Sequence, residues 1–221
     1  YSFGVSPLNK FGNPIKNFLL RQRDMYSIFN RGLLGKLLYS FSAGEAALRS
    51  ISHIPVSKKT SFLDVGCGSG KLLYRLRNCG FTNLLGIDPF LDEDISYSNG
   101  LMIKKESLHR LGGSWDVIMM HHSFEHVPDP REVLESIQKI LSPNGVCIIR
   151  IPTVSSYAWK HYRENWMALD PPRHFYLHSV ESMNILAEQA GLRIHNVIYD
   201  SYDIQFWGSE QYLRDIPLLA G

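Results

Sequence analysis

The chain has 221 residues, of which 44% are hydrophobic and 20% are charged, a composition typical of a globular protein. This length predicts one domain with an extension, or two small domains. The longest stretch without Asp, Glu, Lys or Arg is ten residues. A membrane-spanning helix needs about 18 apolar residues, so none is expected. No charged start followed by an apolar block indicates a secretory signal near the N-terminus.

The cysteines indicate the compartment. Cys67, Cys79 and Cys147 are odd in number and widely spaced, which disfavours a disulfide framework and favours a reducing compartment. We therefore expect a cytoplasmic protein. No CxxC pair is present, so a cysteine zinc site is not expected. Because the chain begins with Tyr1 rather than methionine, we expect it to be part of a longer protein.

The net charge of +2 conceals an uneven distribution. Residues 1–60 carry nine basic and two acidic side chains, a formal charge of +7, whereas residues 61–221 carry −5. This basic segment could be a solvated cap over a site, an interfacial helix on anionic lipid, or a source of charge for a diphosphate-bearing substrate. We favour a cap together with an anionic substrate. Nucleic acid is disfavoured as a partner, because the whole chain is only weakly basic and no recognition motif occurs.

The basic segment has a helical pattern. Its apolar residues recur four apart at Met25, Phe29, Leu33 and Leu37. We therefore expect residues 1–57 to form a helical N-terminal cap or arm.

From residue 61 onward, β-prone runs alternate with amphipathic helices. The runs that predict strands are residues 61–65, 83–87, 101–103, 115–120, 146–149 and 192–199. Strands separated by helices of about ten residues predict βαβ units and a mostly parallel sheet. We expect a doubly wound α/β core over residues 58–208 and a C-terminal tail over residues 209–221.

Turn and capping residues mark the helices between these strands. Gly80 is placed to end the helix predicted at residues 71–78. Asp129 is placed to cap a second helix, and Ser179 a third that ends at Gly191. Residues 142–145 (SPNG) predict a turn before the strand at 146–149, and the long connection 152–178 is expected to be functional, as a lid.

The strongest chemical signal is a glycine-rich turn between the first strand and its helix. Asp64 precedes Gly66, Gly68 and Gly70, and missing side chains let the backbone approach a ligand closely. Asp88 ends the next strand about 20 residues later, where a carboxylate suits a pair of ribose hydroxyls. The spacing is GxGxG rather than the GxGxxG of dinucleotide folds. The alternative interpretation is a tight turn that holds no ligand.

Several motifs together resemble the class I S-adenosylmethionine-dependent methyltransferases: DVGCGSG at 64–70, GID at 86–88, WDVI at 115–118 and EHVPDP at 125–130. The run LDPPRH at 169–174 is similar to one branch of that family, which often methylates small molecules and sugars. The resemblance covers roughly residues 60–200. It implies a Rossmann-like, mostly parallel sheet of seven strands, with S-adenosylmethionine as cofactor and S-adenosylhomocysteine as product.

The resemblance also implies which residues hold the cofactor. The glycine loop would bind the methionine portion, Asp88 the ribose, and Pro89 or Phe90 would flank the adenine, with the turn of Glu106 and Ser107 at its edge. His121, with His122, would line the floor beside the sulfonium. The cofactor-binding positions are thus Asp64, Gly66, Cys67, Gly68, Gly70, Asp88, Pro89, Ser107 and His121.

Such a site would catalyse an in-line displacement, in which the protein aims a nucleophile at the methyl group and excludes water. An alcohol nucleophile must lose its proton, and histidine is the side chain best suited to accept it near neutral pH. The catalytic candidates are His122, His126 and His174. For His126 the alternative is a hydrogen bond that only fixes its loop, and for His174 a structural brace.

Residues 121–126 (HHSFEH) could instead ligate a metal, since nitrogen ligands recur four apart. A helix would be needed to bring them to one face, and Asp129 and Pro130 start the helix later. We therefore expect no metal.

Aromatic residues are dense in the predicted lid, at Tyr157, Trp159, Tyr162 and Trp166. They could form a wall for a sugar face or a quinone ring, a cation–π surface for the sulfonium, or packing within the lid itself.

We predict a methyltransferase that acts on an oxygen of a small, anionic or sugar-containing acceptor, most favourably a saccharide or a nucleotide- or lipid-linked sugar. Two alternatives stay open at this point. One is an NAD-dependent oxidoreductase on the same fold, and the other is a cofactor-binding scaffold without catalysis.

Overall fold

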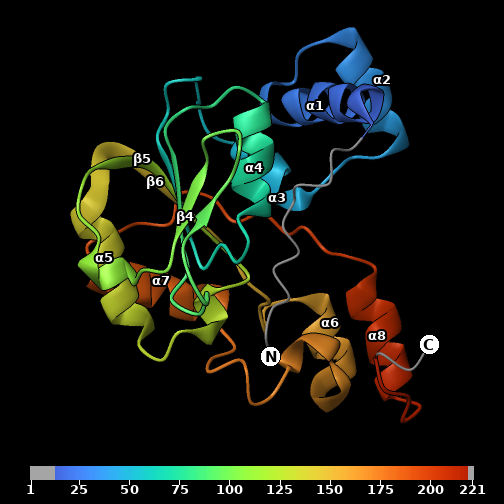
Figure 1. Cartoon of the computed structure of the whole chain (residues 1–221). Helices are drawn as coiled ribbons and strands as arrows, with labels where there is room; N and C mark the ends of the chain where they lie inside the picture. Colours follow the sequence, from blue (N-terminus) through green and yellow to red (C-terminus); the bar gives the residue numbers. More distant parts are fainter. Residues whose placement is uncertain (1–12, 219–221) are drawn as a thin grey trace. The chain divides into compact units, whose positions relative to one another are not determined.

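The computed structural model describes residues 13–218, and Figure 1 shows the course of the chain. The strands form one six-stranded sheet in the order β3–β4–β2–β1–β5–β6. Their bounds are β1 (Phe62–Val65), β2 (Leu84–Ile87), β3 (Ile95–Ser96), β4 (Met102–Lys104), β5 (Trp115–His121) and β6 (Leu141–Arg150). β1 runs parallel to β2 and β5, β2 runs parallel to β4, and only β3 is recorded as antiparallel to its neighbour. The expected mostly parallel, Rossmann-like fold is confirmed.

The order of the strands reverses beside β1. The chain moves outward from β1 through β2 and β4 on one side, and then returns to β5 and β6 on the other. Asp64 lies opposite both Gly86 of β2 and Met119 of β5. Parallel strands end at the same edge of the sheet, and open α/β sheets bind their ligands at that edge, where the order reverses.

The prediction of seven strands is wrong, because the sheet formed by residues 13–218 has six. Residues 192–199, predicted as a strand, are neither helix nor strand. Val197, Ile198 and Tyr199 are 45%, 48% and 62% exposed, so no covering layer buries these three apolar side chains as it would in a strand. The predicted turn at 142–145 lies inside the bounds of β6, and Ser142 Oγ donates a hydrogen bond to Asp116 Oδ1 of β5 at 3.3 Å.

Helices occupy most of the remaining described chain. The α-helices are α1 (Pro14–Phe29), α2 (Leu33–Phe41), α3 (Ala46–Ile51), α4 (Lys71–Asn78), α5 (Pro130–Ile140), α6 (Tyr157–Tyr162), α7 (Val180–Gln189) and α8 (Ile204–Tyr212). Short 3₁₀ turns are η1 (Leu108–Arg110), η2 (Phe124–His126), η3 (Arg163–Asn165) and η4 (Met167–Leu169). None of the described helices is both long and apolar enough to cross a membrane.

The predicted helix ends are confirmed. Gly80 has a φ of +92° after α4, and the N–H groups of Gly80 and Phe81 bond back to Arg77 and Leu76. Asp129 accepts from the N–H of Glu132 at 3.0 Å at the start of α5. Ser179 forms a reciprocal capping box with Ser182 at the start of α7.

One hydrophobic core joins the first helices to the sheet. Buried side chains of α3 (Leu48, Ile51) and α4 (Leu73, Leu76) pack with Phe62 of β1. In Figure 1, α1 and α2 lie side by side, near α4. α2 packs closely on α1 through its glycine: a Cβ at Gly35 would lie 2.5 Å from the main-chain oxygen of Gln22.

A buried ion pair also joins α1 to α4. Arg75 of α4 donates to Asp24 of α1 through Nε at 2.8 Å and through a second guanidinium nitrogen. The Asp24 side chain is only 4% exposed, so the pair fixes the position of α1 on α4.

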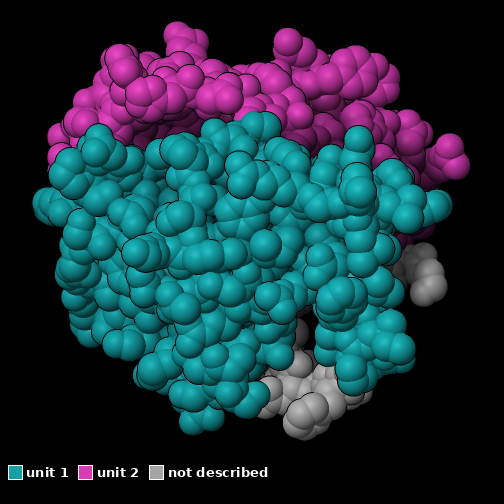
Figure 2. Space-filling model, turned by 90° about the horizontal axis from the view of Figure 1, so that it is seen from above, with its two compact units in different colours: residues 1–121, 139–149 teal, residues 122–138, 150–221 magenta. Residues whose placement is uncertain are grey.

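The chain divides into two compact units, which Figure 2 shows in different colours. Unit 1 comprises residues 1–121 and 139–149, and unit 2 comprises residues 122–138 and 150–221. The predicted boundaries after residues 57 and 208 stay predictions. Residues 1–12 of the predicted N-terminal cap and residues 219–221 of the predicted tail lie outside the described residues.

Candidate active site

The glycine-rich loop connects β1 to α4 in unit 1. Gly66, Gly68 and Gly70 have backbone φ values of +71°, +54° and +72°. Residues other than glycine rarely adopt this region of φ. A Cβ at Gly70 would lie only 2.7 Å from Cγ1 of Ile103 in β4, whereas a Cβ at Gly68 would meet nothing within 4 Å. Gly70 is therefore required for packing against the sheet, and Gly68 leaves open space for a ligand.

Hydrogen bonds hold this loop to the end of β2. The N–H of Gly66 donates to the carbonyl of Ile87 at 2.8 Å, and the N–H of Gly68 donates to Asp88 Oδ2 at 2.9 Å. The hydroxyl of Tyr97 donates to the carbonyl of Ser69 at 2.6 Å. The loop is therefore shaped before any ligand arrives. The sequence motifs give no signal for the role of Tyr97.

Asp88 is the residue that joins the two strand ends. Its Oδ1 accepts from the N–H of Phe90 at 2.9 Å, while Oδ2 accepts from Gly68. Each carboxylate oxygen can accept more than one hydrogen bond, and the side chain is half-buried, so both oxygens can still receive a hydroxyl. This geometry suits the two adjacent hydroxyls of a ribose.

Asp64 lies in the interior at the end of β1 and is only 4% exposed. Burial, and then the charge of Asp88, raise the pKa of its carboxyl group to about 8. An ammonium group brought close to Asp64 would favour the ionised carboxylate. The residues of the loop therefore fit an adenosyl amino acid, with a diol for Asp88, a cation for Asp64 and open space at Gly68.

The other predicted cofactor residues of unit 1 differ in what they present. The thiol of Cys67 faces β2, since a Cβ at Gly86 would lie 2.6 Å from its sulfur, and burial raises its pKa. Pro89 is exposed beside Asp88. Ser107 is half-buried, and its N–H donates a hydrogen bond to Oε1 of Glu106 at 2.9 Å. His121 is the last residue of β5 and is half-buried. The structure brings Asp64, Cys67, Gly68 and Asp88 together.

The predicted catalytic histidines lie in unit 2, around a carboxylate. Glu125 is 1% exposed, and its Oε1 lies 3.6 Å from Nδ1 of His122 and 4.0 Å from Nε2 of His174. The rings of His126 and His174 have centroids 4.9 Å apart. His122 has a φ of +54°, an uncommon conformation for a non-glycine residue that is often found at functional sites.

Backbone carbonyl groups orient two of these rings. Nδ1 of His126 lies 2.9 Å from the carbonyl oxygen of Arg173, and Nδ1 of His174 lies 2.9 Å from that of Ala168. A carbonyl oxygen only accepts hydrogen bonds, so each Nδ1 carries a proton, and in the neutral ring Nε2 then keeps a lone pair. Burial lowers the pKa of His174, although the negative charge of Glu125 opposes this effect.

Sequence reasoning missed the importance of two residues in unit 2. Glu125 faces two of the predicted histidines, and the sequence signal was its place in the run 121–126. His178 is 4% exposed, lies against the rings of Phe124 and Tyr176, and has a pKa lowered by burial. Nothing in the sequence distinguishes His178 from a surface histidine.

The aromatic residues of the predicted lid pack mainly on one another. Trp166 and Tyr162 are buried, and Trp159 meets Trp166 edge-on with ring centroids 5.9 Å apart. Phe206 of α8 packs against the same cluster. Of the four predicted aromatics, only Tyr157 is strongly exposed, at 68%. The packing interpretation therefore holds for three of them.

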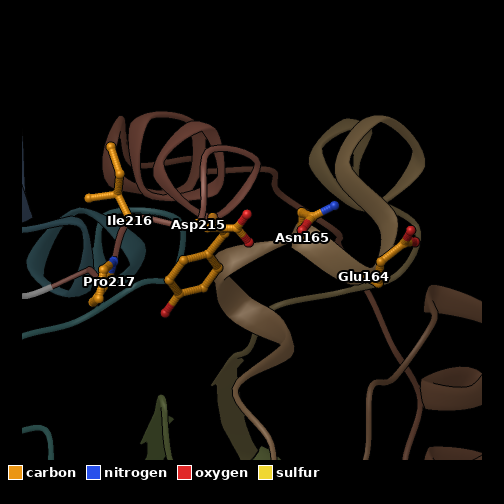
Figure 3. A pocket seen from close by; sticks show the side chains of 6 residues that line it. Glu164, Asn165, Asp215, Ile216 and Pro217 are labelled. Carbon is orange, nitrogen blue, oxygen red and sulfur yellow. The ribbon is translucent and has the colours of Figure 1, made fainter.

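A hollow of about 370 Å³ lies elsewhere in unit 2 (Figure 3). It is lined by Glu164, Asn165, Tyr212, Asp215, Ile216 and Pro217. None of the residues predicted to bind the cofactor or to catalyse lines it, so it is not the candidate site.

A family model described as a methyltransferase domain matches residues 36–197. This is well over half of the chain, and the chain therefore belongs to the methyltransferase domain family. The family predicted from the sequence motifs, that of the methyltransferases, is confirmed.

Similar curated proteins are aligned over part of their length. The ubiquinone biosynthesis O-methyltransferase of Erwinia tasmaniensis is 30% identical over 108 residues, 44% of this chain and 44% of the relative. The glycine/sarcosine/dimethylglycine N-methyltransferase of Actinopolyspora halophila is 28% identical over 125 residues, 51% of this chain and 22% of the relative. The chain thus spans less than half the length of these relatives.

Solved structures of low identity share the fold. The mycolic acid cyclopropane synthase CmaA1, complexed with S-adenosylhomocysteine, has a TM-score of 0.56 at 13% identity, covering 89% of this chain and 77% of that one. The magnesium protoporphyrin IX methyltransferase of Synechocystis PCC 6803 has a TM-score of 0.52 at 16% identity, covering 82% and 87%.

Proposed function

We propose that this chain transfers a methyl group from S-adenosylmethionine to an oxygen atom of a small acceptor. The observation that carries the proposal is the cluster of His122, His126 and His174 around the buried Glu125. In the sequence the cluster begins with the residue that follows β5, the strand paired with β1. Relatives named ubiquinone biosynthesis O-methyltransferases support oxygen as the methylated atom.

For this reaction the protein mainly has to position the acceptor and accept its proton. S-Adenosylmethionine supplies a methyl group on a sulfonium sulfur, which is a good leaving group. As the acceptor oxygen bonds to the methyl carbon and the carbon–sulfur bond breaks, the acceptor hydroxyl loses its proton. A neutral imidazole near the hydroxyl can take that proton. His126 and His174 offer Nε2 for this role, since their Nδ1 atoms are bonded to carbonyl groups.

For the acceptor, we propose a saccharide or a nucleotide- or lipid-linked sugar. The excess of basic side chains in residues 1–60 supports an anionic group on it. The lid aromatics give this proposal less support than the sequence suggested, because Tyr162 and Trp166 are buried in their own cluster. A ubiquinone precursor is the second candidate, and the names of the relatives support it.

The test is methyl transfer from labelled S-adenosylmethionine to a panel of nucleotide sugars, free saccharides and ubiquinone precursors. We expect label in one sugar class, with equal formation of S-adenosylhomocysteine. Label only in the ubiquinone precursors would replace the sugar proposal. Cofactor binding with no transfer to any acceptor would favour the scaffold alternative, and binding of NAD alone would favour an oxidoreductase.

We also propose that α1 and α2 contact an anionic lipid surface. Large apolar side chains are exposed on these helices: Ile15, Phe18, Leu33, Leu34, Leu37 and Phe41, with Leu33 at 89% and Phe41 at 83%. Exposed basic side chains accompany them at Lys16, Arg21, Arg31 and Lys36. Basic amphipathic helices bind anionic membranes by burying apolar side chains while their cations meet the headgroups. That the same helices form a cap over the site stays a prediction.

A further inference from the structure

We propose that Glu125, His126 and His174 form a binding site for one divalent transition-metal ion of the Zn²⁺ type. These residues each offer a ligand atom, and the three atoms lie within 4.8 Å of one another. All three residues belong to unit 2, so the arrangement does not depend on unit 1. The sequence disfavoured a metal because Asp129 and Pro130 begin the helix after the histidines. The structure supplies the missing ligand from residue 174 instead.

The orientation of the two rings is the first argument. In metal sites a ligating histidine usually donates its other ring N–H to a carbonyl or carboxylate, which fixes the tautomer and the ring. His126 and His174 have this arrangement, with Nδ1 of each 2.9 Å from a main-chain carbonyl oxygen. In the neutral form of each ring this arrangement leaves Nε2 unprotonated, which is the form that binds a metal.

The carboxylate is the second, independent argument. Glu125 is 1% exposed, and its Oε2 has no hydrogen-bond partner among the described residues. A buried carboxylate oxygen without a partner is costly, and coordination of the carboxylate to a cation is one of the few ways to satisfy it. Its Oε1 faces the histidine cluster, at 4.0 Å from Nε2 of His174.

The ligand set selects the kind of ion. Two imidazole nitrogens and one carboxylate form a set that binds Zn²⁺ and chemically similar first-row ions, whereas Mg²⁺ and Ca²⁺ prefer oxygen ligands throughout. Metal–ligand bonds of about 2.0–2.1 Å place tetrahedral ligands about 3.3 Å apart. The side chains must therefore draw inward when the ion binds. Three protein ligands leave a coordination position open, to which an oxygen of an acceptor could bind.

If the proposed function is also correct, the two roles combine. An acceptor hydroxyl bound at the open position would lose its proton more readily. His122, whose side chain is 52% exposed, would then be the histidine free to receive that proton. This consequence rests on the proposed function, but the metal site itself does not.

The test is a titration of the chelator-stripped full chain with Zn²⁺ by calorimetry and with Co²⁺ by visible absorption, without cofactor or acceptor. We expect one ion per chain and the intense visible bands of Co²⁺ with nitrogen ligands in a low-coordinate site. The Glu125→Gln and His174→Asn variants should bind at least about tenfold more weakly. The control is His195→Asn, which removes an exposed histidine of the same unit outside the cluster.

Equal affinity in wild type, Glu125→Gln and His174→Asn would overturn the proposal, as would equal weakening by His195→Asn. The Co²⁺ spectrum needs no variant, so a weak spectrum typical of six-coordinate Co²⁺ would overturn it even if a variant failed to fold. S-Adenosylhomocysteine binding, measured separately without metal, tests the proposed function. A failure of the metal proposal can therefore be distinguished from a failure of the proposed function.

Discussion

At Asp64, burial and a neighbouring charge act in the same direction on one carboxyl group. Its pKa in the folded chain is about 8, against an ordinary value of 3.8. Between these values the folded state keeps a proton that the unfolded state has lost. In this range the contribution of Asp64 to the free energy of unfolding therefore falls by roughly 1.4 kcal/mol for each unit that the pH rises. The fall levels off above the pKa of the folded state.

We expect this effect to be visible as a pH dependence of stability. Between about pH 5 and pH 8 the free energy of unfolding of the ligand-free protein should fall more steeply in wild type than in the Asp64→Asn variant. Chemical denaturation at several pH values measures both slopes. Equal slopes would show that Asp64 does not hold its proton in the folded state.

His174 tests the catalytic proposal. Whether Nε2 of His174 removes the acceptor's proton directly or coordinates the proposed ion that binds the acceptor, His174→Ala should lower kcat by about 10² or more. The affinity for S-adenosylhomocysteine should be unchanged, because the loop and Asp88 are untouched. The exposed His195 provides the matched control, and His195→Ala should retain wild-type kcat. A loss below about threefold for His174→Ala would reduce His174 to a structural brace.

At the scale of elements, two glycines of the loop between β1 and α4 are needed for different reasons, Gly70 for packing and Gly68 for ligand space. Both Gly68 and Gly70 have positive φ, so an alanine at either position costs about 1–2 kcal/mol. At Gly70 the added Cβ would also press on Ile103, which adds about 1–3 kcal/mol. At Gly68 the Cβ would enter the space assigned to the ligand instead.

The two variants should therefore differ in kind. Gly70→Ala should be destabilised more than Gly68→Ala. Gly68→Ala should remain folded and bind S-adenosylhomocysteine at least about tenfold more weakly. Gly112→Ala is the control, since its Cβ would meet nothing within 4 Å. Melting temperatures and calorimetric titrations measure the two effects. Wild-type affinity in Gly68→Ala would mean that the ligand does not approach this glycine.

The exposed face of α2 allows a test of the lipid proposal. Burying Leu33 and Leu37 in a membrane interface contributes about 1.5–3 kcal/mol each. The double variant Leu33→Glu with Leu37→Glu should therefore bind vesicles containing phosphatidylglycerol at least about tenfold more weakly than wild type. Leu213→Glu, at a similarly exposed leucine of unit 2, should bind as wild type. Cosedimentation measures this. Equal binding of wild type to neutral and anionic vesicles, or none, would contradict the proposal.

The elements that sequence predicts best are those fixed by local rules. The glycine loop, the Schellman end of α4 at Gly80 and the Ser179 cap follow from backbone conformation and hydrogen bonding within a few residues. Residues 192–199 show the opposite case. Their apolar residues suit a strand, but pairing depends on a neighbour and a covering layer that the local sequence does not specify.

At the scale of the whole molecule, long-range contacts decide what the motifs leave open. His126 and His174 are 48 positions apart in the sequence, and only the folded path of unit 2 brings their rings together. The burial of Glu125 and the packing of Trp166 have the same origin. The cofactor loop could be predicted because β1, the turn, α4 and β2 follow one another within about 26 residues. The histidine cluster could be predicted only as a set of candidates.

The central claim is that the loop at Gly68 and the carboxylate of Asp88 bind the adenosyl amino acid. The most direct measurement is a calorimetric titration of the chain with S-adenosylhomocysteine and, separately, with NAD. We expect one S-adenosylhomocysteine per chain and no heat from NAD. Asp88→Asn keeps an oxygen for the N–H of Gly68 but removes the charge, and should weaken binding about tenfold or more. Undiminished affinity in that variant, or binding of NAD in place of S-adenosylhomocysteine, would contradict the claim.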